Sequence, residues 1–168
     1  LFFFSGTQIG PLPLKGGKPN HIHFYAGKDL NDFDEVHLLK NYEKLEFYDL
    51  QGSHWAPHIV HKEIWDRVGG FSEEFDPGFG SDPDLNMKLW QIGIRLFKGI
   101  NLSRTYHFGS LTTRKKLNIE RNNANITFLK KWGITIDFFT KHYLHRGDVY
   151  NGPLSNFKLS TKNVLSYL

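Results

Sequence analysis

Two carboxylates that follow a glycine- and aromatic-rich loop are the residues best suited to chemistry in this chain. Residues 69–85 read Gly-Gly-Phe-Ser-Glu-Glu-Phe-Asp-Pro-Gly-Phe-Gly-Ser-Asp-Pro-Asp-Leu, and Asp82 and Asp84 lie where a helix is expected to begin. Unpaired backbone N–H groups and the positive end of the helix dipole keep a carboxylate ionised there. Beside a glycine loop that can close over a ligand, such a carboxylate is suited to be a general base. Asp82 is therefore the candidate catalytic residue.

A structural role would explain the same two residues. Asp82 followed by Pro83 has the pattern of a helix N-cap with proline at the first helical position, and Asp84 would add first-turn charge. The local pattern alone does not choose between capping and catalysis. Capping does not require Phe79 between two glycines, nor the strand and histidine that follow, and these neighbours favour the functional interpretation.

The segments around the two carboxylates together resemble the second half of the family 2 glycosyltransferases, which have the GT-A fold. The resemblance covers about residues 55–115 and is carried by Gly69-Gly70-Phe71, residues 77–85, Lys88-Leu89-Trp90, Gly93 and Tyr106-His107. In that family a Gly-Gly-Phe-Asp-Glu segment leads to a Glu-Asp-x-Asp-Leu motif that opens a helix. Ser81 stands where the family has Glu, which is a departure at a position that contacts the acceptor.

The resemblance implies a sugar transfer from a nucleotide-sugar to a hydroxyl of a glycan or lipid-linked acceptor, with inversion. Asp82 would be the base that takes the acceptor proton, and Asp84 would orient the acceptor or fix the helix start. A divalent cation, Mn²⁺ or Mg²⁺, would neutralise the diphosphate. His107, at the end of a predicted strand, would bind the metal or the phosphate.

Further residues near these motifs are candidates for substrate contacts. Phe79 and Ser81 are predicted to contact the acceptor, and so is Trp55, for which core packing is the alternative. Hydroxyls and cations after the His107 strand would hold the diphosphate leaving group. These diphosphate candidates are Thr112, Thr113, Arg114 and Lys115, and a solvated basic loop explains them equally well.

Other chemical patterns are weaker. His54, His58 and His61 invite a zinc site, but their spacing is not that of a known one, and surface or packing histidines are the better interpretation. The segment 32–34 matches the Asp-x-Asp pattern that binds metal in glycosyltransferases. No apolar strand precedes it, so a capped helix is favoured there.

Composition limits the function classes. The chain has 168 residues, 39% hydrophobic and 15% aromatic, which suits one folded domain with a buried core. The absence of cysteine excludes disulfides and thiolate metal sites. No apolar run approaches the roughly 18 residues of a membrane span. The net charge of +4 is mild, and we expect no nucleic-acid partner. Without a membrane span, we expect a cytoplasmic protein. The basic run 114–116 could bind either diphosphate or an anionic membrane surface, so peripheral association with the inner face of the plasma membrane is the open alternative.

The periodicity predicts alternating strands and helices. Strands are expected near residues 21–25, 47–50, 55–60, 94–97 and 102–108. Helices are expected over 32–45 with Asn31 or Asp32 as cap, before Gly69, over 83–91, over 119–132, and over 138–145. The predicted fold class is α/β, a partial GT-A (nucleotide-diphospho-sugar transferase-like) fold whose mixed sheet is flanked by helices.

The beginning of the chain bears on its expected activity. Residues 1–4 lack a starting Met, a basic segment and a cleavage site, so they are not a signal peptide, and they resemble the end of a buried strand within a larger protein. The family's nucleotide-binding half and its Asp-x-Asp motif would lie upstream. We therefore predict an acceptor-side portion over 1–135, a C-terminal helix with a loosely held tail over 136–168, and no transferase activity of the fragment alone. A non-catalytic glycan-binding or scaffold module is the alternative.

Overall fold

A mixed β-sheet forms the centre of the protein in the computed structural model, which describes residues 1–11, 20–52, 56–109 and 123–158. Strand β1 pairs in parallel with β2 on one side and with β5 on the other, while β4 and β3 join β1 and β5 antiparallel. The strands are β1 (Phe2–Gly10), β2 (His21–His23), β3 (Leu50–Gln51), β4 (His58–Val60) and β5 (Leu96–Tyr106). The predicted α/β class with a mixed sheet is confirmed.

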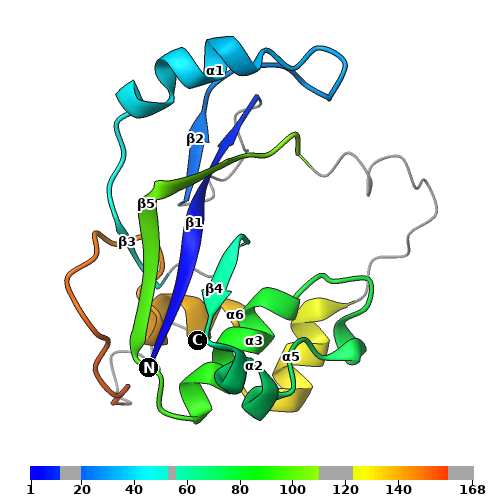
Figure 1. The fold of residues 1–168 in the computed structure, drawn as a ribbon. Coiled ribbons are helices and arrows are strands. Elements are labelled where there is room, and N and C mark those ends of the chain that lie inside the picture. Colours follow the sequence, from blue (N-terminus) through cyan, green and yellow to red (C-terminus); the bar gives the residue numbers. More distant parts are fainter. Residues whose placement is uncertain (12–19, 53–55, 110–122, 159–168) are drawn as a thin grey trace.

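Helices gather at both ends of this sheet. Figure 1 shows α2, α3, α5 and α6 together at one end, at the bottom of the view, and α1 alone at the other. The helices are α1 (Glu35–Asn41), α2 (Lys62–Val68), α3 (Ser81–Gln91), α5 (Ala124–Trp132) and α6 (Ile136–Phe138), with 3-10 turns at Tyr42–Lys44 and Glu73–Phe75 and a π-helical segment at Phe139–Tyr143. Within the described ranges, none of these helices has the length and apolar character needed to cross a membrane.

The hydrophobic core lies between the sheet and the lower helices. Side chains at alternate positions of a strand face opposite sides of a sheet, so Phe3 is fully buried whereas Phe2 is partly exposed. Leu89 of α3 and Phe97 of β5 are fully buried in the same core, together with Phe139. The apolar run at residues 1–4 is therefore the start of β1, and the prediction that it ends a strand is wrong.

The helix predicted over 32–45 is shorter, and its cap is a different residue. Asp34 is the N-cap of α1, because its side chain accepts a hydrogen bond from the backbone N–H of His37 (2.8 Å). Asp32 instead accepts the backbone N–H groups of Lys28 and Asp29, both at 2.9 Å, which closes the preceding loop. The favoured interpretation of segment 32–34 as a capped helix start, rather than a metal motif, agrees with these contacts.

Strand β5 is longer than the sequence indicated. The prediction placed separate strands at 94–97 and 102–108, but Leu96–Tyr106 is continuous. Its partner β1 accommodates the irregular middle by a shift in register, from Gly6 opposite Ile100 to Thr7 opposite Arg104. Backbone pairing with β1 therefore keeps β5 continuous between residues 97 and 102, where the apolar pattern of the sequence is interrupted.

The segment after the π-helical turn is attached to the rest of the fold. The backbone N–H of Gly147 donates to Gln51 (3.2 Å), and that of Leu154 donates to Arg95 (2.8 Å). Leu154 and Phe157 pack against the hydrophobic core. These contacts hold the described part of the tail, up to residue 158, against the sheet and α3. The predicted division of the chain at residue 135 stays a prediction.

Gly6 allows a loop to lie directly on β1. A Cβ at this position would be 2.7 Å from the carbonyl oxygen of Ser103 and 2.8 Å from the Pro57 ring. We expect Gly6→Ala to lower the free energy of unfolding by about 1–3 kcal/mol, the usual cost of overpacking a tight site. Urea unfolding of Gly6→Ala and of the exposed control Leu102→Ala measures it, and equal stability of the two variants would contradict the expectation.

Candidate active site

Helix α3 begins two residues earlier than the capping interpretation of Asp82 would place it. Gly80 is the N-cap, in the left-handed conformation with φ of 88°, and it makes no side-chain capping bond. Asp82 is therefore inside the first turn, and the alternative interpretation, in which it caps the helix with Pro83 at the first helical position, does not hold. A Cβ on Gly80 would be 2.8 Å from that of Ala124 and 2.9 Å from the ring of Phe75. This close packing, together with the positive φ, requires glycine and sets where the helix begins.

Asp82 is partly exposed and lies beside a histidine. Its side chain is 30% exposed, and Oδ1 is 3.7 Å from Nε2 of His58, whose side chain is 11% exposed. His58 is the first residue of β4, and its ring packs at 5.1 Å from that of Phe3. The candidate base thus keeps access to solvent on a helix start that is packed against the sheet.

Asp84, two residues after Asp82 on α3, is fully buried and contacts several polar side chains. Oδ2 accepts a hydrogen bond from the hydroxyl of Ser72 (2.7 Å), and Oδ1 accepts one from the indole N–H of Trp132 (2.8 Å). Lys131 Nζ lies 3.0 Å from Oδ1, and Lys88 Nζ lies 3.8 Å from Oδ2. Of the two roles expected for Asp84, these contacts match fixing the helix start, and its burial is at odds with direct contact to an acceptor.

Lys131 links this buried carboxylate to the loop before α3. It also pairs with Glu74 and donates to the Ser72 hydroxyl (2.9 Å). Burial lowers the pKa of Lys131, but the hydrogen bonds to Glu74 and Asp84 more than offset this, so its pKa is raised and the ammonium stays charged. The network therefore joins three elements: the 3-10 turn at residues 73–75, α3 and α5.

An open pocket of about 600 Å³ lies along the loop before α3. Its lining residues are Phe71, Ser72, Glu73, Phe75, Asp76, Pro77, Gly78 and Ser81. Phe71 is 45% exposed and Phe79, in the same loop, 36% exposed. Aromatic faces next to carboxylates and hydroxyls are suited to a ligand with both apolar faces and hydroxyl groups, such as a sugar. Ser81, an expected acceptor contact, lines this pocket, and its hydroxyl donates to the carbonyl of Gly78 (2.7 Å).

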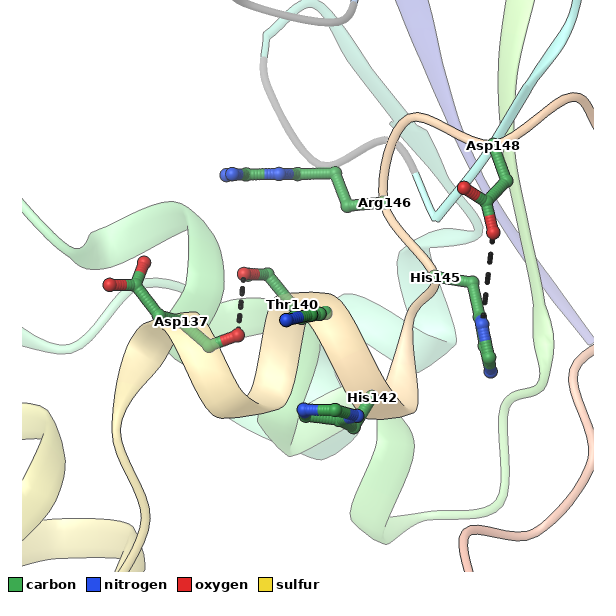
Figure 2. A pocket seen from close by; sticks show the side chains of 7 residues that line it. Asp137, Thr140, His142, His145, Arg146 and Asp148 are labelled. Carbon is green, nitrogen blue, oxygen red and sulfur yellow. Dashed lines mark hydrogen bonds and ion pairs between the residues drawn. The ribbon is translucent and has the colours of Figure 1, made fainter. Parts of the chain in front are cut away.

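A second hollow lies on the C-terminal side of α6. Figure 2 shows its labelled side chains: Asp137, Thr140, His142, His145, Arg146 and Asp148. Its charges offset one another, since His145 Nδ1 lies 3.8 Å from Asp148 Oδ2 and the charge of Asp137 acts on Arg146. Burial lowers the pKa of Arg146 and of His142. This hollow does not include any predicted site residue, and the pocket along residues 71–81 is the better candidate.

His107 lies at the other end of the sheet from the start of α3. It follows β5 directly, and its backbone N–H donates to Ile9 (2.7 Å). His58, next to Asp82, pairs with Ser5, four residues before Ile9 on β1, which corresponds to about 13 Å along a strand. Figure 1 also shows the end of β5 in the upper part of the view and α3 in the lower part. The structure thus does not make His107 a neighbour of Asp82.

Some predicted site residues lie outside the described part of the chain. These are Trp55 and the diphosphate candidates Thr112, Thr113, Arg114 and Lys115. Within the described ranges, no group of three His, Asp or Glu side chains could hold a metal ion. Of the histidines considered for zinc, His58 contacts Asp82, and His61 accepts the backbone N–H of Glu63 at the start of α2 (3.3 Å).

Sequence reasoning missed the residues that surround the two carboxylates. His58 was considered as a metal ligand or as a surface or packing residue, not as a partner of Asp82, and Lys131 and Trp132 only as parts of a helix. Helix α5 is some forty residues from α3 in the chain, so no local pattern signals its contact with Asp84; the separation is 48 residues for Trp132. The arrangement offers one partly exposed carboxylate that follows the pocket residue Ser81 in the chain, and one buried carboxylate that accepts a hydrogen bond from the pocket residue Ser72. Comparisons with protein-family models, with curated proteins and with solved structures found no match.

Proposed function

We propose that this protein is a glycosyltransferase of the GT-A type, which transfers a sugar from a nucleotide-sugar to a hydroxyl of a glycan or lipid-linked acceptor. The observation that carries the proposal is the position of Asp82, partly exposed in the first turn of α3 and directly after Ser81, which lines the pocket along residues 71–81. The resemblance of the same segment to family 2 glycosyltransferases agrees with that position. The mixed sheet with flanking helices supports the α/β class, and GT-A is the finer proposal.

The chemistry assigns one role to each part of this site. In an inverting transfer, the acceptor oxygen attacks the anomeric carbon while the diphosphate leaves on the opposite side. Asp82 would take the proton of the attacking hydroxyl, since its side chain is partly exposed and it follows the pocket residue Ser81 directly in the chain. Phe71 and Phe79 would hold the acceptor by contact with its apolar face. Asp84 would act through the helix that it anchors, because it is fully buried.

A divalent cation, Mn²⁺ or Mg²⁺, belongs to the proposal through the resemblance, where it would neutralise charge on the diphosphate. His107 is its proposed ligand. In the described residues no set of three His, Asp or Glu side chains is placed to hold an ion, so His107 alone does not make a site and we derive no step through the cation. A cytoplasmic or membrane-peripheral location likewise remains a prediction.

The second candidate is a non-catalytic glycan-binding module with the same pocket. Ser81 favours it, because the hydroxyl that replaces the family's Glu is used within the loop, in a bond to Gly78. Such a module would keep the aromatic contacts to a sugar and would release no nucleotide. The two candidates therefore differ in one measurable product.

The test is a transfer assay on the natural protein that carries these residues. A panel of nucleotide-sugars is supplied with Mn²⁺ or Mg²⁺, and release of nucleoside diphosphate is measured with and without oligosaccharide acceptors. We expect release that depends on one donor and on an acceptor, and a loss of acceptor saturation in Phe71→Ala but not in the exposed control Leu102→Ala. Glycan binding that requires Phe71, without release from any donor, would instead favour the binding module.

A further inference from the structure

The side chain of His58 is a titratable neighbour of the candidate base. Its Nε2 lies 3.7 Å from Oδ1 of Asp82, and only 11% of the imidazole side chain is exposed. We propose that His58 is a positioning residue for Asp82, which holds one carboxylate oxygen so that the carboxylate keeps one orientation beside the pocket at residues 71–81. This inference rests on the proposed function, which supplies the reaction in which the orientation matters.

Strand β4 fixes the imidazole from the sheet side. His58 pairs with Ser5 of β1, and the carbonyl of the preceding Pro57 accepts the N–H of Gly6 (2.9 Å). The ring is tilted against that of Phe3, which is fully buried in the core, with 5.1 Å between centroids. An imidazole attached to a paired strand and packed on a core ring has few orientations. It can hold a carboxylate without losing much side-chain entropy when substrate binds.

A residue of the pocket wall also lies near the same imidazole. The ring of Phe71 lies 6.2 Å from that of His58, and Trp65 packs edge-on against Phe71 at 5.2 Å. Phe71 lines the candidate acceptor pocket. The His58 ring thus lies near both the core residue Phe3 and the pocket residue Phe71, and these packed neighbours limit its movement while it contacts Asp82.

The side chain of Asp82 is more exposed than that of Asp84. Asp82 lies in the first turn of α3 with a side chain that is 30% exposed, whereas Asp84 is fully buried. The separation of 3.7 Å is longer than a hydrogen bond. Such contacts are often long in unliganded enzymes and shorten in the complex with substrate. In this scheme the acceptor proton goes to Asp82, and His58 acts only through the position of that carboxylate.

A kinetic experiment on the natural protein tests the role. We expect His58→Ala to lower kcat by about 10-fold or more, in line with the cost of a misplaced catalytic group, while KM for the acceptor changes by less than about twofold. Added imidazole should restore part of kcat, since it can occupy the emptied space between Phe3 and Phe71. His61→Gln, in the same segment with its ring exposed, is the matched control and should leave kcat unchanged. An unchanged kcat in His58→Ala, or a loss that imidazole does not restore, overturns the proposal.

A second experiment needs neither donor nor acceptor. The free energy of unfolding is measured for His58→Gln, Asp82→Asn and the double variant of the 168-residue chain. Coupling between the two side chains predicts a double-variant effect that differs from the sum of the single effects by more than the experimental error. Additive effects overturn the proposed contact. Coupling that is present in a protein without transfer activity would reject the proposed function and keep the contact, so the two failures are distinguishable.

Discussion

Replacing Asp82 by Asn should lower the turnover of sugar transfer by at least about 100-fold, the usual scale for loss of a general base. Asparagine has nearly the same size as aspartate but cannot accept the acceptor proton. The side chain is partly exposed and makes no helix cap, so the substitution should leave the fold intact. The measurement is kcat of the natural protein with the donor found in the panel assay, with circular dichroism as the check on folding.

A nearby carboxylate provides the matched control. Asp76 lines the candidate pocket but lies in the loop before α3, six residues before Asp82 in the chain. Asp76→Asn therefore removes an equal charge and leaves the proposed base in place. We expect Asp76→Asn to change the KM for the acceptor more than kcat. Near-normal turnover of Asp82→Asn would end the assignment of Asp82 as the base.

Replacing Asp84 by Ala should destabilise the protein strongly. The sequence alone predicts a cost of about 1 kcal/mol, the value for loss of a helix-terminal carboxylate. In the structure Asp84 is fully buried, and its removal leaves the Trp132 indole N–H without its acceptor and takes from Lys131 one of its two carboxylate partners. Breaking one side of a buried ion pair typically costs about 3–5 kcal/mol. We therefore expect a loss of that size in the free energy of unfolding, measured by urea denaturation.

Two further variants separate burial from charge in this prediction. Asp84→Asn keeps an oxygen that can accept from Ser72 or Trp132, so its loss should be smaller than that of alanine. Asp66→Ala removes an exposed carboxylate paired with Lys62 on α2 and should cost less than about 0.5 kcal/mol. A cost of only about 1 kcal/mol for Asp84→Ala would show that the residue acts as a helix-terminal charge and that the network adds little.

Local sequence signals predicted the elements that depend on a few neighbouring residues. Helix α2 ends at Gly69 and α5 at Gly133, both in the left-handed conformation that glycine adopts without strain. Asp34 at the start of α1 shows the limit of such signals, because three nearby polar residues could each cap the helix and the loop contacts of Asp32 decided between them. The continuity of β5 depended on pairing with β1, which no local pattern contains.

The sequence by itself determined that the chain forms an α/β domain and that Asp82 and Asp84 lie at the start of a helix after a glycine loop, because these features follow from periodicity and from backbone preferences of a few adjacent residues. Only the tertiary structure separated the two carboxylates. It buried Asp84 against residues of α5 and left Asp82 partly exposed beside His58 of β4. The physical reason is that burial and charge pairing are set by contacts between segments far apart in the chain, whereas helix ends and turns are set within a few residues.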